Sequence, residues 1–485
     1  MKRIIALLLA LLMISVIFTS CGNDTNTDVQ ESDEVQSAEA DSEQETTEAG
    51  TPHYDGVFQA GFGRKDITPN TPIPLNTGVI MNNVLDPLYV SAIAVYDGKD
   101  TALIITADIK NLGEDAYLAL TKRIKMTTGV PENNIMFSAT HNHSAPTPSS
   151  SGSETIVLRR WSSLVTTRTV EACEEAIADL ADAEIYIGTF KTTGMAFVRR
   201  YILEDGSFAD IMTVGSRKVV AYESEADDTA QLIRFVRAEK KDILLANWQC
   251  HVASMIGIYP SSISADLPYF FRREVENGDD DLVCAYYQGA SGNINSVAKV
   301  SRSAKYRFYP EMCAAFGEKA LEASRLDKMT KIEAGKIYAK RKMYTAPAMK
   351  YPEDKVNQAI EAKEAGYPDN LLKKYGFSHW REVDAVAASK NRKETVTFYI
   401  SAMKFGDLSF VAVPYEMYDT NGMYVKENSE EKMTFVLTCA GGAYAYVAST
   451  EASKHGGYDA YKTFFAYGTG DAVAEELVEM LKKLK

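Results

Sequence analysis

Cysteine is scarce in this chain of 485 residues, which contains six, and no two of them form a CxxC pair. The lack of such pairs argues against a thiolate metal site. Cys21 stands apart near the start of the chain. The other five are widely spaced and lie mostly inside apolar runs: Cys173, Cys250, Cys284, Cys313 and Cys439. An odd number with this spacing does not indicate a disulfide framework, so we expect these five to be small buried hydrophobic residues.

Clustered positive charge is also missing. The formal net charge is −14, and residues 22–50 supply −10 of it through ten acidic side chains without any Lys or Arg. The first 21 residues carry +2, which leaves −6 for residues 51–485. No basic stripe is present, and this argues against nucleic acid as a partner. We find no internal repeat with a period of about 20 to 50 residues.

The first 21 residues have the layout of a secretory signal. Lys2 and Arg3 precede an apolar run over residues 4–18, and small residues then lead to Cys21. The run is short for a membrane span. The pattern resembles a bacterial lipoprotein signal, which implies lipidation of Cys21 and attachment to the outer face of the cytoplasmic membrane. A plain cleaved signal and a secreted protein are the alternative, because Phe18 is unusual at the start of a lipoprotein cleavage site.

The remainder of the chain divides by composition. Residues 22–52 are acidic and nearly free of large apolar side chains, so we expect a disordered tether that like charges extend. Residues 53–485 have ordinary globular composition and exceed the usual size of one core. Within them, residues 346–396 are rich in Lys, Glu and Ala and predict a helical insertion. Residues 470–484 predict an amphipathic closing helix.

From residue 101 onward the hydrophobic pattern predicts alternating strands and helices. Residues 102–108 and 134–140 are typical of buried strands. Between them, the helical spacing over residues 117–124 ends at Gly129. A strand, helix and strand in succession favour parallel pairing. We therefore predict an α/β fold with mixed β-sheets flanked by helices.

Polar side chains follow the predicted strands at their carboxyl ends. Beyond the two strands above, apolar runs predict further strands over residues 242–250, 282–288, 407–414 and 434–440. In α/β sheets, ligands collect outside the carboxyl ends of strands. Five side chains of types that bind metals or transfer protons stand at these ends: His141, His143, His251, Glu416 and Tyr446. We expect the active site at this edge.

The histidines give the strongest of these signals, because the chain has only six and three of them follow predicted strands. His141 and His143, two residues apart on extended backbone, project to the same face, so one can bind a cation while the other faces a ligand. Each has an ordinary explanation when taken alone. The histidine pair could be hydrogen-bonded in a loop, His251 could be a core residue, and Glu416 could cap a helix. For the sequence to contain no site here, each of these separate explanations would have to be true at the same time.

Seven blocks of this sequence, in order, resemble those of the neutral/alkaline non-lysosomal ceramidase family. They are DITP (66–69), ATHNHSAP (139–146), NWQCHVAS (247–254), ISADLP (263–268), YQGASGNIN (287–295), VPYE (413–416) and AYVAST (445–450). Together they span nearly the whole chain from about residue 56 on. The resemblance implies an extracytoplasmic zinc-dependent hydrolase that cleaves an amide (N-acyl) or related bond with a zinc-activated water.

The family pattern also implies residue functions. The implied Zn²⁺ ligands are His141, His251, Glu416 and Tyr446. Zinc lowers the pKa of its bound water to about 7 and polarises a carbonyl oxygen. His143 would face the substrate carbonyl or the leaving nitrogen. Arg199 is similar to the substrate-contacting arginine of the family, with Arg200 as a near alternative and an ordinary ion pair as the other explanation.

Two departures from the family pattern bear on the substrate. Asn295 stands where the family has a catalytic serine, and Asn293 stands where it has Asp. An amide cannot act as an acyl-accepting nucleophile, but it can donate a hydrogen bond to an oxyanion or orient water. The chain ends at Lys485, shortly after the last block, so we expect the C-terminal immunoglobulin-like domain of the family to be absent.

These departures argue against ceramide itself as the substrate. We expect a small-molecule or lipid-like N-acyl compound, and we expect the membrane to be contacted through the lipid anchor at Cys21. The alternative is a non-catalytic ligand-binding lipoprotein on a degenerate ceramidase-like scaffold.

Overall fold

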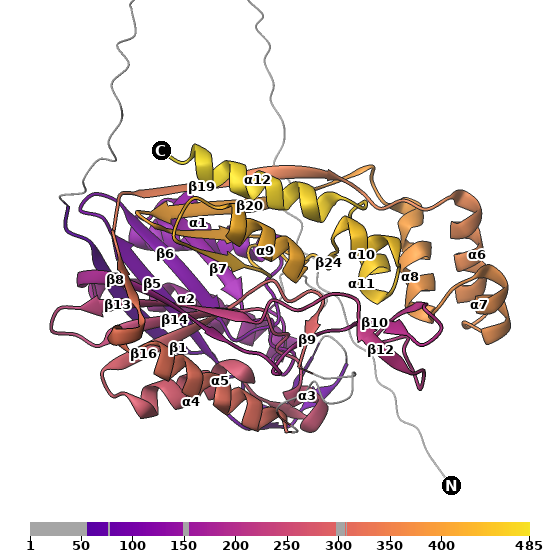
Figure 1. The fold of residues 1–485 in the computed structure, drawn as a ribbon, viewed down its shortest axis with the longest axis horizontal. Helices are drawn as coiled ribbons and strands as arrows, with labels where there is room; N and C mark the ends of the chain where they lie inside the picture. Colours follow the sequence, from indigo (N-terminus) through magenta and orange to yellow (C-terminus); the bar gives the residue numbers. More distant parts are fainter. Residues whose placement is uncertain (1–55, 76–77, 149–154, 297–305, 307) are drawn as a thin grey trace, which may run out of the picture. The chain divides into compact units, whose positions relative to one another are not determined.

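Two β-sheets packed face to face form the centre of the protein in a computed structural model (Figure 1). The structure describes residues 56–75, 78–148, 155–296, 306 and 308–485. The predicted signal with Cys21 and the predicted tether over residues 22–52 lie outside these residues.

The larger sheet has nine strands in the order β16-β14-β13-β8-β1-β5-β6-β7, with β18 paired to β8. These strands are β1 (Gln59–Asp66), β5 (Tyr89–Tyr96), β6 (Thr101–Ala107), β7 (Ile135–Ala139), β8 (Ala181–Lys191), β13 (Thr229–Arg237), β14 (Asp242–Trp248), β16 (Leu282–Gln288) and β18 (Thr330–Ile332). The smaller sheet has the order β19-β20-β21-β23. Its strands are β19 (Ile337–Pro347), β20 (Thr395–Phe405), β21 (Leu408–Ala412) and β23 (Met433–Leu437).

Helices cover the outer faces of both sheets, which gives a helix–sheet–sheet–helix arrangement. On the nine-stranded sheet lie α1 (Glu114–Thr128), α2 (Ile156–Ala178), α4 (Leu267–Gly278) and α5 (Tyr309–Ala323). On the four-stranded sheet lie α9 (Asp419–Asn428) and α12 (Thr469–Lys483). Because the central strands are covered on both faces, their sequences are nearly continuous apolar runs. Helix α2 approaches β1 so closely that a Cβ at Gly61 would lie 2.0 Å from the carbonyl oxygen of Ala176.

The observed elements confirm the α/β prediction. Helix α1 ends at Gly129, whose φ of 79° is left-handed, and α12 is the predicted closing helix. The five cysteines that follow Cys21 are all buried and unpaired. None of the helices within the described residues is long and apolar enough to cross a membrane.

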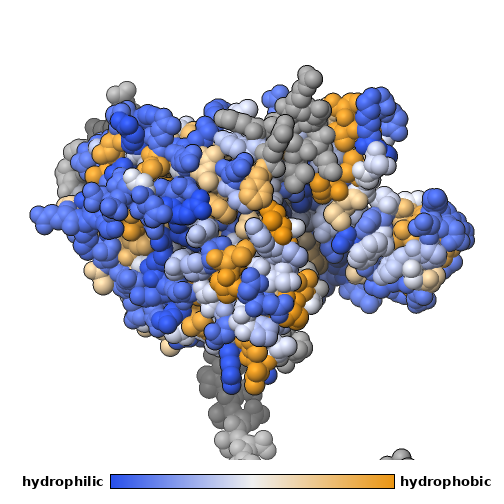
Figure 2. Space-filling model, turned by 90° about the horizontal axis from the view of Figure 1, so that it is seen from below, coloured by the Kyte–Doolittle hydropathy of each residue, from blue (hydrophilic) through white to orange (hydrophobic). Residues whose placement is uncertain are grey.

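Three helices connect β19 to β20: α6 (Glu353–Glu364), α7 (Asp369–Tyr375) and α8 (Trp380–Ala388). They enclose an apolar cluster of their own that includes Val356, Phe377 and Val383. Helix α8 packs against the short helix α11 (Tyr458–Tyr461). Seen from below in Figure 2, this group of helices projects at the right, and its surface is mostly hydrophilic.

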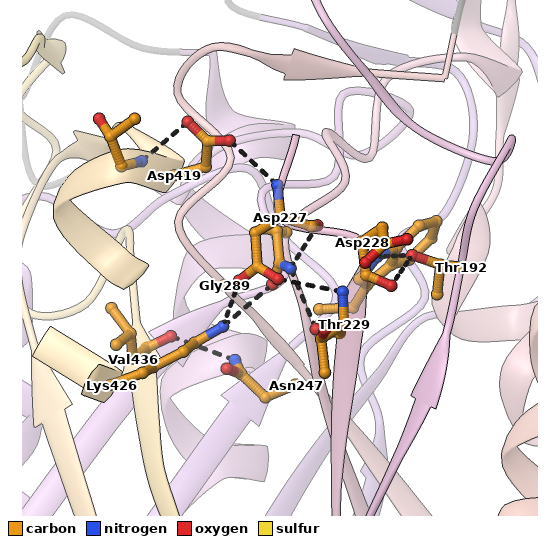
Figure 3. A network of polar contacts seen from close by, with 12 residues as sticks. Thr192, Asp227, Asp228, Thr229, Asn247, Gly289, Asp419, Lys426 and Val436 are labelled. Atoms are coloured by element: carbon orange, nitrogen blue, oxygen red, sulfur yellow. Dashed lines mark hydrogen bonds and ion pairs between the residues drawn. The ribbon is translucent and has the colours of Figure 1, made fainter. Parts of the chain in front are cut away.

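The carboxyl ends of three parallel strand pairs meet at one edge of the two sheets. The pairs are β6–β7, β14–β16 and β21–β23. Backbone and side-chain bonds join the two sheets there. Thr438 N donates to the carbonyl oxygen of Gln288 at 3.1 Å, and Asn247 Nδ2 donates to that of Val436 at 3.1 Å (Figure 3). Loops from both sheets therefore converge at this edge.

Candidate metal centre

His141 follows β7 in a constrained turn at this edge. Its φ is 58°, a left-handed conformation that is uncommon outside glycine and that often occurs at functional sites. The imidazole Nδ1 lies 3.0 Å from the carbonyl oxygen of Lys110 and 3.3 Å from Cys439 Sγ. His143 N donates to the carbonyl oxygen of Val252 at 3.0 Å, which ties this loop to the loop that carries His251.

Three imidazoles converge on one point. His143 Nε2 lies 3.2 Å from His141 Nε2 and 3.2 Å from His251 Nε2. The rings of His141 and His251 have centroids 4.7 Å apart. Nitrogens that bind one zinc ion tetrahedrally, each at about 2.05 Å, are roughly 3.3 Å apart. The spacing of these nitrogen atoms therefore suits three ligands of a single ion, and together the three residues could hold a metal.

Glu416 completes the cluster from the segment that follows β21 of the smaller sheet. It lies in β22 (Glu416–Met417), which pairs in parallel with β24 (Tyr446–Val447). Its Oε2 lies 3.2 Å from His141 Nε2 and 3.6 Å from His251 Nε2. This oxygen is buried and accepts no hydrogen bond from the described residues. A buried carboxylate oxygen without a donor suits a cation, so the donor set fits a divalent metal.

The charges of the cluster depend on one another. Burial acts against protonation of His141, but the Cys439 thiol and the Glu416 carboxylate raise its pKa to about 10. Burial would raise the pKa of Glu416, yet His141 and His251 lower it below its usual range. Burial and the charge of His141 lower the pKa values of His143 and His251. In the absence of a metal, these shifts favour a charged pair of His141 and Glu416 and disfavour protonation of His143 and His251.

Contacts behind the imidazoles distinguish the three histidines. Because a carbonyl oxygen accepts from Nδ1 of His141, the ring keeps its Nδ1 proton, and it presents a lone pair at Nε2 once a bound cation replaces the Nε2 proton. The carbonyl oxygen of Ser291 lies 3.3 Å from His251 Nδ1 and fixes that ring in the same way. Among the described residues, no carbonyl oxygen contacts Nδ1 of His143, and this imidazole is the most exposed of the three.

Arg199 and Tyr446 lie together beside the cluster. The guanidinium of Arg199 is centred 4.9 Å from the Tyr446 ring, and its Nη2 donates to Asp459 Oδ1 at 2.8 Å and to the carbonyl oxygen of Gly292 at 2.7 Å. Both arginines form buried ion pairs, Arg199 with Asp459 and the neighbouring Arg200 with Glu223. Of the two arginines left open by the sequence, only Arg199 contacts the loop that leads to Asn295.

Asn295 lies in β17 (Ile294–Asn295), which pairs antiparallel with β9 (Phe197–Val198). Its Oδ1 is 3.4 Å from Ser296 Oγ, and that hydroxyl lies 2.7 Å from Ser254 Oγ. Asn295 thus occupies the same short loop as Gly292, whose carbonyl oxygen Arg199 contacts.

Three residues of this region were not predicted from the sequence to belong to the site: Lys110, Asp459 and Cys439, which was expected only to be buried. Lys110 and Cys439 stand just past the carboxyl ends of β6 and β23, which is the same signal that singled out the histidines. Asp459 lies in the short helix α11, where no sequence feature points to the site.

Comparison with protein-family models and with curated proteins gives no match. Solved structures do share the fold. One is a neutral ceramidase from Pseudomonas aeruginosa, with a TM-score of 0.67 and 16% identity over 89% of this chain and 75% of that chain. Another is a ceramidase complexed with C2, with a TM-score of 0.65 and 15% identity over 88% and 75% of the two chains. At these identities the likeness establishes a ceramidase-like fold.

Proposed function

We propose that the protein is a zinc-dependent hydrolase that cleaves an N-acyl amide or a related bond. The observation that carries this proposal is the convergence of three imidazole Nε2 atoms with the buried carboxylate oxygen of Glu416, on a ceramidase-like scaffold. Bound zinc supplies a water of lowered pKa and polarises the scissile carbonyl.

The proposed ligands are His141, His251, Glu416 and Tyr446. Carbonyl oxygens fix both of these histidines with Nε2 free to bind, as is usual for metal ligands. Tyr446 is the strand partner of Glu416, and side chains of paired residues lie on the same face. This register supports Tyr446 as the fourth ligand.

His143 is the proposed proton carrier and substrate contact. It is the most exposed of the three imidazoles, and a histidine ring can accept or donate a proton near the scissile bond. Asn295 is proposed to donate a hydrogen bond from its amide to the developing oxyanion or to the attacking water. Arg199 is proposed to contact the substrate and to hold Gly292 in place.

We further propose that the enzyme acts outside the cytoplasm, anchored through a lipid on Cys21. The substrate would then be a small or lipid-like N-acyl compound that reaches the outer face of the membrane.

The experiment is a hydrolysis screen of N-acyl compounds with the zinc-loaded protein, run with and without a chelator. We expect cleavage of at least one compound, loss of cleavage with the chelator and recovery on adding zinc. Full zinc occupancy without turnover across a broad panel of amides and esters would refute the proposal.

Asn295 favours a second candidate, a ligand-binding lipoprotein that has lost catalysis together with the serine. In that case a bound N-acyl compound should remain intact. Mass spectrometry of the ligand recovered after long incubation separates the two candidates, because hydrolysis changes its mass and binding alone does not.

A further inference from the structure

Helix α9 begins three residues after Glu416, and its first residue contacts the loop that carries Asn295. Asn293 Nδ2 donates to Asp419 Oδ1 at 2.6 Å, and Asp419 N donates to Asn293 Oδ1 at 2.9 Å. Both side chains are buried. Asn293 precedes Asn295 by two residues, so this reciprocal pair fixes the position of that loop.

The same helix contacts the segment that carries His251. Lys426 lies two helical turns after Asp419, on the same face. Its Nζ donates to Asp227 Oδ2 at 2.9 Å and to Gln249 Oε1 at 3.3 Å. Gln249 precedes His251 by two residues, and its Nε2 donates to the carbonyl oxygen of Asp227 at 2.6 Å.

The two contacts form one network through Asp227, and Figure 3 shows the part of it that joins Asp227 to Asp419 and Lys426. Asp227 N donates to Asp419 Oδ2 at 3.2 Å, so Asp227 contacts both ends of the helix face. Backbone contacts also join the loop that carries Asn295 to the strand that carries Glu416. Gly292 N donates to the carbonyl oxygen of Met417 at 2.7 Å, and a Cβ at Gly292 would lie 2.5 Å from the carbonyl oxygen of Glu416. The loop therefore rests directly on the strand that carries Glu416.

We propose that α9 is a positioning element of the metal centre. Through Asp419 and Lys426 it sets the spacing among three groups on separate segments: Glu416, His251 and Asn295. Asp419, Asn293 and Lys426 act through these groups and are positioning residues. Mutation of the partners that orient the ligands of a metal commonly lowers its affinity about 10–100-fold.

The pair of Asn293 and Asp419 allows a reciprocal test. Asn293→Asp places two carboxylates against each other, and at neutral pH they repel unless they share a proton. The double variant Asn293→Asp with Asp419→Asn restores one donor and one acceptor between the two side chains, although Thr420 N, which donates to Asp419 Oδ1 at 2.8 Å, loses that acceptor. Asn134→Asp is a matched control, because Asn134 Nδ2 also donates a hydrogen bond, to the carbonyl oxygen of Thr101 at 3.0 Å. Asn134 lies just before β7 begins, at the end of β7 that is opposite to the metal centre.

Zinc affinity is the first readout, measured by competition with a chromophoric chelator. We expect Asn293→Asp to weaken zinc binding about tenfold, in the range seen for outer partners of metal ligands. The double variant should recover to within roughly threefold of the native affinity, and Asn134→Asp should not change it. A double variant no better than Asn293→Asp, or a single variant with native affinity, would overturn the proposal.

This affinity readout rests on the proposed function, so a second readout is made without zinc. Amide hydrogen exchange should accelerate in Asn293→Asp over residues 289–295, 247–252 and 413–420 together, and return in the double variant. If the native protein binds no zinc, the proposed function fails while exchange still tests the positioning element. Faster exchange in only one of the three segments would contradict it.

Discussion

Glu416→Gln is the most informative single change, because it removes the charge of the proposed ligand and keeps its shape. The Glu416 Oε2 atom lies 3.2 and 3.6 Å from two imidazole nitrogens and is buried without a hydrogen-bond donor among the described residues. Removing one partner of a buried charge pair costs roughly 3–5 kcal/mol, so zinc affinity should fall on the order of 10²–10⁴-fold.

The assay is a zinc titration against a chromophoric chelator, together with metal analysis of the purified variant. Glu431→Gln is the matched control. Glu431 Oε2 is also buried without a hydrogen-bond partner, but this residue pairs with Lys404 and precedes β23, so it lies at the end of that strand opposite to the metal edge. Native affinity in Glu416→Gln, or an equal loss in Glu431→Gln, would refute the reasoning.

Three further predictions follow from the same structure. His141→Ala should lose zinc, whereas His143→Ala should keep zinc and lose at least about 10²-fold in hydrolysis, as measured by metal analysis and turnover; equal zinc loss in both would contradict these assignments. Burial raises the pKa of Asp266 to about 6, so its contribution to stability is present below the unfolded value near 3.8 and is lost as the pH rises through 6. Asp266→Asn should therefore gain melting temperature relative to the native protein between pH 4 and 7, and a constant difference would speak against this. Phe316→Ala removes a ring packed against Trp248, so it should cost about 3–5 kcal/mol in denaturant unfolding while zinc stoichiometry in the folded protein stays unchanged.

The strands were predictable because burial on both faces leaves a plain signal in the sequence. The runs at β6, β7, β14, β16, β21 and β23 are largely apolar, and all of them except β21 end at a polar residue or directly before one. The sequence does not reveal that these strands belong to two sheets packed on each other, because pairing between distant segments has no local signature. Only the structure shows that the ends of β7, β16 and β23 meet.

The site was predictable to the extent that its residues directly follow strands. His141, His143, His251 and Glu416 come together as expected from that rule, with nitrogens and oxygen 3.2 to 3.6 Å apart. Asp459 escaped prediction because it reaches Arg199 from α11, far from any strand end.

The contacts of α9 escaped prediction for a related reason. An Asn–Asp pair separated by 126 residues has no pattern of its own in a single sequence. Its effect on the site depends on a packing of helix against loop that only the fold determines.

The most direct measurement is a crystal structure of the zinc-loaded protein with anomalous diffraction recorded on both sides of the zinc edge. We predict one strong peak about 2.0–2.2 Å from His141 Nε2, His251 Nε2 and a carboxylate oxygen of Glu416. A zinc-loaded crystal without a peak at this position, or with its zinc bound by other residues, would contradict the account.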